Sequence, residues 1–187
     1  MANYQGLVQV DITSFDAFLN EVNGNGYDVD YLYGYQCVDL PKLLAGNAGR
    51  TSPYWKSGSS GYAREGWTDV DSRNYNAGTL FIPIYNKRDI KRGDIVILNA
   101  TASNPYGHVA FATTDWNNST SSAPLLGQNQ VDPSASVGHP TTITNVNVST
   151  FLGGFRFKAW NQSPPLNYKY PKGHFPWVLY ARKLRSK

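Results

Sequence analysis

A single thiol is the most reactive group that this sequence offers. Cys37 is the only cysteine in 187 residues and lies in YGYQCVDLPKLL, residues 33–44. A helix-like run follows it, so we expect Cys37 at a helix N-terminus, where free N–H groups and the helix dipole favour a thiolate. Gln36 precedes it and could donate its amide to a developing oxyanion. The stretch predicts a nucleophile, with a buried structural thiol as the alternative.

A cysteine nucleophile needs a base, and the sequence holds three histidines. His108 opens the apolar run GHVAFAT, where a strand end can hold a side chain rigidly and leave it accessible. His139 and His174 lie beside prolines in loop-like sequence. We therefore predict His108 as the general base, with His139 as the second candidate.

The base in turn needs a polar side chain to fix its tautomer. The stretch LLGQNQ, residues 125–130, reads as a strand that places Gln128 and Asn129 on opposite faces. One of the two should share the side of His108, and we favour Asn129. The alternative is a strand-end amide that caps a turn.

The surrounding pattern indicates helices first and strands afterwards. Thr13 or Ser14 could cap a helix that Asn23-Gly24 ends, and a second helix is expected from Gln36–Cys37. Residues 46–79 read mostly as loop with one short helix. Strand patterns follow at 93–98, 107–113, 125–130, 143–148 and 155–158. The order predicts an α+β fold with N-terminal helices packed on an antiparallel sheet.

Composition narrows the classes of protein. One cysteine excludes zinc-finger and iron–sulfur sites built on several thiols. Apolar runs are short and the N-terminus lacks the pattern of a signal peptide, so neither membrane insertion nor standard secretion is expected. The stretch 133–187 holds eight Lys/Arg and no acids. This basic end predicts either a polyanionic partner or a charged tail that serves solubility.

The ordered motifs resemble the CHAP domain, the cysteine- and histidine-dependent amidohydrolase/peptidase family. The resemblance rests on YGYQCVDL, KRGDIVIL, YGHVAFA and LGQNQ, with FLGGFRF as the closing strand, and covers residues 14–157. It implies a papain-like (NlpC/P60-like) fold and places the nucleophile at Cys37, the base at His108 and the orienting residue at Asn129. Gln36 matches the usual glutamine before the nucleophile. Many members carry a glutamate two positions before that asparagine, where this chain has Gly127.

A calcium loop is also expected upstream of the nucleophile. Numbered from Asp28, carboxylates occupy positions 1, 3 and 12, as in an EF-hand-type loop. Similarity to family members that bind calcium implies side-chain ligands from Asp28, Asp30 and Asp39 and carbonyl ligands from Leu32 and Gly34. Tyr33 stands where an EF-hand has glycine, and a solvated Asp-rich turn is the alternative. The expected role is structural.

The resemblance implies a peptidoglycan hydrolase that cleaves an amide bond, either as a muramoyl amidase or as an endopeptidase. We expect residues 1–158 to form the catalytic domain and the basic, aromatic extension 159–187 to dock on it and to contact anionic wall polymers. We expect a monomer, made in the host cytoplasm and acting after release, or virion-associated. Candidate groove walls are Tyr54, Trp55, Trp67 and Tyr106, with ordinary packing as the alternative for each.

Two further classes of function remain open from the sequence. One is a non-catalytic wall-binding or structural module that keeps the fold. The other is a basic nucleic-acid-binding protein, which we do not expect because the sequence carries no motif for one.

Overall fold

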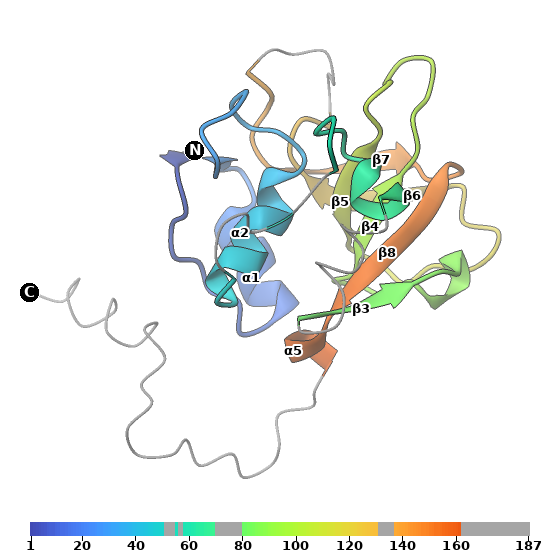
Figure 1. Cartoon of the computed structure of the whole chain (residues 1–187). Coiled ribbons are helices and arrows are strands. Elements are labelled where there is room, and N and C mark those ends of the chain that lie inside the picture. Colours follow the sequence, from blue (N-terminus) through green and yellow to red (C-terminus); the bar gives the residue numbers. More distant parts are fainter. Residues whose placement is uncertain (51–54, 56–57, 70–79, 131–136, 162–187) are drawn as a thin grey trace, which may run out of the picture.

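A six-stranded antiparallel sheet forms the centre of the molecule (Figure 1). The computed structural model describes residues 1–50, 55, 58–69, 80–130 and 137–161. The strand order is β3-β8-β4-β5-β6-β7. The bounds are β3 Phe81–Ile84, β4 Ile95–Leu98, β5 His108–Ala112, β6 Ser122–Gly127, β7 Thr142–Asn147 and β8 Phe151–Phe157. Two N-terminal helices pack beside the sheet, so the predicted α+β class is confirmed.

The first helix, α1 (Phe15–Val22), begins and ends where the sequence predicts. The Ser14 side chain accepts a hydrogen bond from the N–H of Ala17 at 3.1 Å, which satisfies one of the free donors of the first turn. Phe15, Phe18 and Val22 recur at helical spacing and are buried. The helix therefore presents one apolar face to the sheet.

The second helix, α2 (Asp39–Asn47), begins later than the sequence predicts. Cys37 lies in a turn two residues before it, because the Asp39 N–H closes back on the carbonyl of Gln36 at 3.0 Å. Pro41 falls in the first helical turn, where its missing N–H costs no hydrogen bond. The expected start at Gln36–Cys37 is thus corrected to Asp39.

The sheet is apolar on both faces, which explains the continuous run IVIL in β4. Ile95 and Ile97 join the core between helices and sheet, whereas Val96 and Leu98 join a second cluster on the opposite face. Successive side chains of a strand point to opposite faces. Both faces of this strand are therefore buried, and the sheet is held firmly at its centre.

Shorter elements complete the fold. The sequence reading missed β3, an edge strand that tolerates Pro83 because an edge residue can leave its N–H side unpaired. It also missed a small parallel pair formed by three residues from each strand. The remaining bounds are β1 Asn3–Gln5, β2 Gly26–Asp28, α3 Glu65–Thr68, a 3-10 turn at Lys87–Asp89 and α5 Lys158–Asn161.

The chain after β8 starts by packing against the domain. The Trp160 indole donates to the carbonyl of Ile12 at 3.0 Å, and its ring contacts Phe15 and Phe18 with centroids 5.5 and 5.7 Å apart. The predicted division at 158/159 therefore falls inside α5. Most of the predicted extension lies outside the described residues, so its docking stays a prediction. Within the described residues, no helix is long and apolar enough to cross a bilayer.

Candidate active site

The thiol lies between the start of α2 and the start of β5. Cys37 is partly exposed, and its sulfur lies against the backbone N–H of Val109, the residue that follows His108. Close packing around the sulfur raises the pKa of Cys37 to about 11, and the Val109 N–H opposes that shift only in part. The resting thiol is therefore protonated near neutral pH and needs a base.

His108 is buried at the first position of β5, as predicted. Burial lowers the pKa of its imidazole to about 4, so the ring is neutral near pH 7. Nε2 of the ring lies 3.3 Å from the side-chain oxygen of Gln130, within hydrogen-bond distance. Among the described residues no hydrogen bond joins His108 to Cys37. A neutral imidazole therefore lies at the start of β5, and the Cys37 sulfur contacts the next residue of the same strand.

Asn129 does not take the position expected for the residue that orients the base. Strand β6 ends at Gly127, and Asn129 adopts a left-handed backbone with φ of 52°, so strand alternation does not reach it. Its side-chain nitrogen donates to the amide oxygen of Gln36 at 3.1 Å, and its oxygen lies 3.4 Å from Nδ1 of His139. In the described structure Gln130, not Asn129, contacts His108. His139 lies beside Asn129 and Gln36.

The Gln36 side chain, next in sequence to Cys37, has hydrogen-bond partners at both its oxygen and its nitrogen. Its oxygen accepts from Asn129, and its nitrogen donates to the carbonyl of Tyr33 at 2.6 Å. An amide nitrogen carries two hydrogens, so one remains for another acceptor. Gln36, the residue before Cys37, therefore has an oriented amide with one N–H left to donate.

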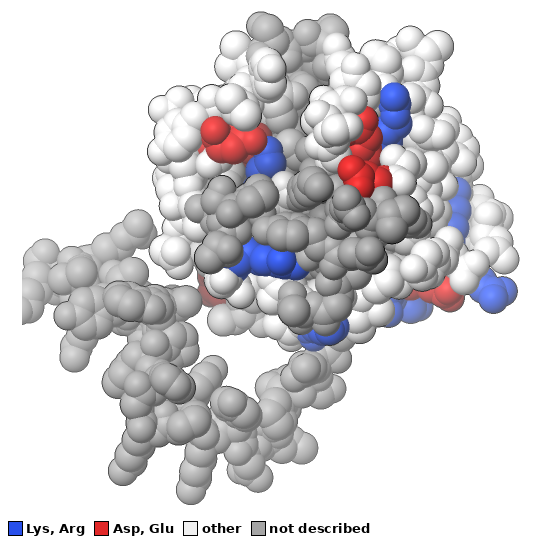
Figure 2. Space-filling model, in the orientation of Figure 1, with Lys and Arg blue, Asp and Glu red and all other residues white. Residues whose placement is uncertain are grey.

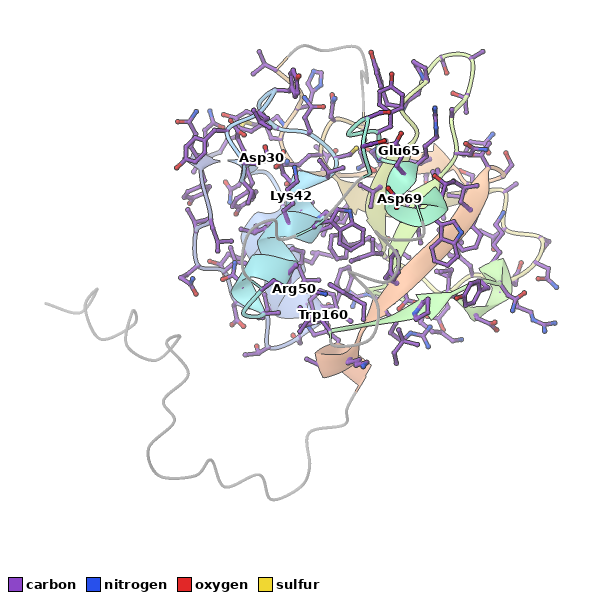
Figure 3. The ribbon with its side chains drawn as sticks, in the orientation of Figure 1. Asp30, Lys42, Arg50, Glu65, Asp69 and Trp160 are labelled. Carbon is purple, nitrogen blue, oxygen red and sulfur yellow. The ribbon has the colours of Figure 1, made fainter. Side chains whose placement is uncertain are left out.

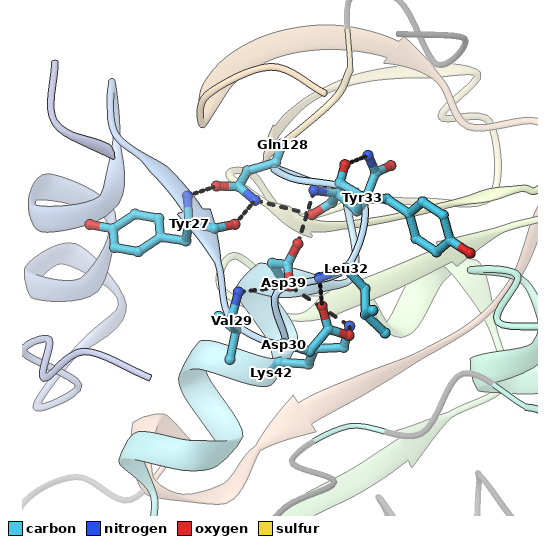
Figure 4. Close-up of polar contacts among 9 residues, drawn as sticks. Tyr27, Val29, Asp30, Leu32, Tyr33, Asp39, Lys42 and Gln128 are labelled. Carbon is cyan, nitrogen blue, oxygen red and sulfur yellow. Dashed lines mark hydrogen bonds and ion pairs between the residues drawn. The ribbon is translucent and has the colours of Figure 1, made fainter. Parts of the chain in front are cut away.

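Gln128 is a site residue that the sequence reading did not assign (Figure 4). It is fully buried, accepts from the N–H of Tyr27 at 2.7 Å and donates to the carbonyls of Tyr27 at 2.9 Å and Gln36 at 3.1 Å. It thereby ties β2 and the turn of the nucleophile to the end of β6. The sequence feature that could have indicated Gln128 is its place in QNQ, a run of three amide side chains. Gln36, Gln128, Asn129 and Gln130 are called the amide cluster below.

A pocket of about 270 Å³ opens beside the base. His108, Asn129 and Gln130 line one part of it, and Thr101 and Asn104 of the β4–β5 connection line another. Its lining carries amides and hydroxyls but, apart from the imidazole, no titratable side chain. The pocket is suited to neutral, polar groups of a ligand.

Three carboxylates gather on the other side of the Cys37 turn. One oxygen from each of Asp28, Asp30 and Asp39 lies within 4.8 Å of the others, and we call these residues the carboxylate cluster. The Asp28 Oδ1 atom is buried and has no hydrogen-bond partner among the described residues. Burial raises the pKa of Asp39 to about 7, although its oxygens accept from the N–H groups of Val29 at 3.1 Å and Gln36 at 2.9 Å.

Lys42 supplies the nearest positive charge to this cluster (Figure 3). Its ammonium lies 2.5 Å from Asp30 Oδ2 and 3.7 Å from Asp39 Oδ1. Acidic and basic side chains of the described surface likewise lie in small mixed groups in the view of Figure 2. One ammonium balances one of three carboxylates, so the cluster keeps a negative surplus when all three are ionised.

The loop between the carboxylates has the backbone that a tight turn requires. Tyr33 has a φ of 66°, although it stands where an EF-hand has glycine, and Gly34 has a φ of 68°. The Leu32 N–H donates to Asp30 Oδ1 at 3.1 Å, while the Gly34 carbonyl accepts from the N–H of Gln36 at 2.9 Å. The loop is thus fixed at both ends, and ligation by its carbonyls stays a prediction.

Two of the predicted groove walls are core residues instead. Trp55 is 2% exposed and packs edge-on against Phe81 and Phe155. Trp67 is 7% exposed and lies over Gly153, where an added Cβ would come within 2.1 Å of the indole. The expectation for both is therefore wrong. Tyr106 is exposed near His108 and stays a candidate, and Tyr54 lies outside the described residues.

One member of the predicted basic end belongs to the folded domain. The Arg156 guanidinium donates to both oxygens of the buried Asp94 at 2.8 Å and to the carbonyl of Asp89. It joins β8 to the turn before β4. Arg156 is therefore committed to an internal ion pair and does not offer its charge to a polyanion. Six of the eight basic residues lie outside the described residues.

Comparisons with known proteins identify a matching family and similar solved structures. The CHAP domain family model matches residues 24–129. Among solved structures, the wild-type endolysin LysIME-EF1 is 24% identical with a TM-score of 0.54, over 79% of this chain and 64% of that chain. Ly7917, also solved with the hydrolyzing product of MDP, is 18% identical with a TM-score of 0.41, over 65% and 53% of the two chains. No curated protein matches the chain.

Proposed function

The chain belongs to the CHAP domain family and has its papain-like α+β fold, and from this premise we propose that it hydrolyses an amide bond of peptidoglycan with Cys37 as nucleophile. One observation carries the proposal. The chain's only thiol lies against the backbone N–H of Val109, the residue that follows His108, within the segment that the family model matches. The pocket beside His108 supports a polar, uncharged substrate segment.

The chemistry follows from a neutral thiol beside a neutral base. His108 takes the Cys37 proton as the sulfur attacks the carbonyl carbon, so that a C–S bond forms and the carbonyl oxygen becomes negative. The Gln36 amide and the Cys37 N–H stabilise that oxyanion. The C–N bond then breaks, and His108 returns the proton to the leaving amine. Water, deprotonated by His108, releases the acyl group and restores the thiol.

Asn129 enters this mechanism through Gln36 rather than through the base. Its amide holds the oxygen of Gln36, which leaves the Gln36 nitrogen facing Tyr33 and the nucleophile's turn. A preorganised donor costs no reorientation when charge develops in the transition state. Asn129 is therefore a positioning residue for the oxyanion donor.

We also propose calcium as a structural ligand of the carboxylate cluster. The donor set fits a hard cation, because it offers carboxylate oxygens and includes a buried Asp28 oxygen without a partner. Asp28, Asp30 and Asp39 would hold the ion, with the Leu32 and Gly34 carbonyls as the further ligands expected from the sequence. The ion would fix the loop that precedes Cys37. Its competitor is the Lys42 ammonium.

The test is mass spectrometry of purified peptidoglycan after digestion by the wild-type protein and by Cys37→Ala, each with calcium and with a chelator. We expect new amine termini only with the intact thiol. The fragment masses then distinguish a muramoyl amidase from an endopeptidase, since the two activities leave the amine on different residues.

The opposite outcome has a definite meaning. If both proteins bind walls from a broad panel of bacteria and release no new amine, the hydrolase proposal is wrong and a non-catalytic wall-binding module replaces it. Binding that depends on residues 159–187 and weakens with salt would support the proposed contact of the basic end with anionic wall polymers.

A further inference from the structure

The Gln130 carboxamide occupies the space above Gly127. A Cβ added at Gly127 would lie 2.9 Å from Cδ of Gln130 and 3.0 Å from its Oε1. The same Cβ would lie 3.0 Å from that of Ala110, which belongs to the strand that His108 opens. The glycine therefore leaves room for a side chain that arrives from three residues further along the chain and ends beside the base.

The orientation of this amide is determined by its partners. Gln130 Nε2 donates to the carbonyl of Leu125 at 3.0 Å and to that of Thr142 at 2.9 Å, so both of its hydrogens are used by β6 and β7. Rotating the amide by 180° would set its oxygen against two carbonyl oxygens. The oxygen therefore faces His108 Nε2, at 3.3 Å.

An acceptor at this place selects one form of the imidazole. A neutral imidazole carries one hydrogen, and the nitrogen that faces a carbonyl-type oxygen must be the one that holds it. With Nε2 protonated, Nδ1 keeps a lone pair. That lone pair is what a base needs to accept the proton of a thiol.

We propose that Gln130 is the positioning residue of His108: its carboxamide, locked between β6 and β7, holds the imidazole as the Nε2–H tautomer and leaves Nδ1 as the basic nitrogen. The role of Nδ1 as a base rests on the proposed function, whereas the assignment of the tautomer rests only on the hydrogen bonds of Gln130. Because the amide is neutral, it orients the ring without adding a negative charge to stabilise an imidazolium. Burial lowers the pKa of His108 to about 4, and the Gln130 contact opposes that shift without reversing it, so the resting ring stays neutral.

The primary test is the tautomer in the wild-type protein, read from ¹⁵N chemical shifts of histidine-labelled protein at pH 7, with His108→Gln to assign the signals. We expect a protonated Nε2 and an unprotonated Nδ1 for His108. A protonated Nδ1 would overturn the proposal. This measurement needs no substrate and no destabilised variant, so it stands whether or not peptidoglycan is cleaved.

Variants then link the tautomer to rate. Gln130→Leu should give a mixture of tautomers and lower kcat on a soluble muropeptide by about 10- to 100-fold with little change in KM. Asn129→Ala, the matched neighbour, should keep the Nε2–H tautomer. Unchanged tautomer and kcat in folded Gln130→Leu, or a mixture in Asn129→Ala, would overturn the assignment. If Cys37→Ala retains the activity, the proposed function fails while the tautomer result remains.

Discussion

The amide cluster and the carboxylate cluster lie on opposite sides of the Cys37 turn. They differ in how their buried polar atoms find hydrogen-bond partners. In the amide cluster, Gln128 and Gln130 find partners for both oxygen and nitrogen among backbone groups and His108. In the carboxylate cluster, like charges gather within 4.8 Å and one buried oxygen has no partner. Gln128 and Gln130 thus have protein partners for both amide atoms, whereas the carboxylate cluster has a surplus of negative charge when all three groups are ionised.

This difference separates two properties of the site. Neutral amides keep their hydrogen bonds over a wide range of pH and salt, because nothing in them titrates. Buried carboxylates depend on a cation and on protonation, as the raised pKa of Asp39 indicates. We therefore expect the amide cluster to set the geometry of the chemistry and the carboxylate cluster to set how stability responds to conditions.

The largest effect is expected from Gln128→Leu. The substitution leaves the N–H and carbonyl of Tyr27 and the carbonyl of Gln36 without their buried partner. At about 1–3 kcal/mol for each buried orphan, the free energy of unfolding should fall by roughly 4 kcal/mol and Tm by about 10 °C. Thermal unfolding followed by circular dichroism measures this. Gln9→Leu, at an exposed position, is the matched control. An equally small change in Tm for both variants would contradict the role of Gln128 in joining β2 and the Cys37 turn to the end of β6.

Calcium should give the next largest effect, confined to the carboxylate cluster. At 100 times its Kd, a ligand that binds only the folded state adds about 2.7 kcal/mol, which corresponds to a rise in Tm of about 5–10 °C. Calorimetric scans with calcium and with a chelator measure the difference. Asp28→Asn should abolish most of the rise, whereas Asp115→Asn, in an exposed ion pair, should keep it. Equal Tm in both conditions would exclude a structural calcium.

Lys42→Met tests the charge balance of the carboxylate cluster, because it removes the ammonium that pairs with Asp30 and Asp39. Without calcium, Asp39 loses its nearest positive charge and the variant should be less stable by about 2 kcal/mol. With calcium the loss should shrink, because the ion no longer competes with the ammonium. Chemical unfolding in both conditions measures the two differences. Lys91→Met, in an exposed pair, should change stability by under about 1 kcal/mol in either condition.

A smaller effect is expected when the Gln36 amide loses its support. Asn129→Ala removes the bond that orients the oxyanion donor and should lower kcat about 10-fold, or roughly 1.4 kcal/mol in transition-state stabilisation. Initial rates on a soluble muropeptide measure it. Restoration of the rate by Asn129→Asp would contradict this role, because the carboxylate cannot donate to the Gln36 oxygen.

The smallest effect should be that of pH near neutrality. The pKa of His108 lies at about 4, below its ordinary value, so the base is neutral at higher pH and is lost only as pH falls through about 4. With calcium saturating, kcat/KM should change by less than about twofold between roughly pH 6 and pH 8. An acid limb near pH 6.5 would show that burial does not keep the His108 ring uncharged.

Local patterns in the sequence predicted much of the fold and part of the site. The cap at Ser14, the apolar runs of β4 and β5 and the order of Cys37 and His108 all depend on short-range rules. The contacts of Gln128, Asn129 and Gln130 do not, because they follow from where β6 ends and from a left-handed φ at Asn129. A period-2 reading carried past that point does not predict that Gln130 is the amide that contacts His108.

Burial was also hard to predict where aromatic residues are frequent. Trp55 and Trp67 stand in loop-like sequence, yet they fill space against Phe155 and Gly153 in the core. Nothing local distinguishes such a residue from an exposed ligand-stacking one such as Tyr106, because both occur among Gly and Ser. Only the position of β8 between β3 and β4 creates the hollow that the two indoles occupy.

The three consecutive amides at 128–130 share one short backbone segment but reach three separate parts of the site. Gln128 contacts the carbonyl of Gln36 in the turn that holds Cys37, Asn129 contacts the Gln36 side chain and Gln130 contacts His108. A small displacement of this segment therefore carries all three in the same direction. The three contacts therefore depend on one another, and a substitution that shifts this segment should change the surroundings of Cys37, Gln36 and His108 at the same time.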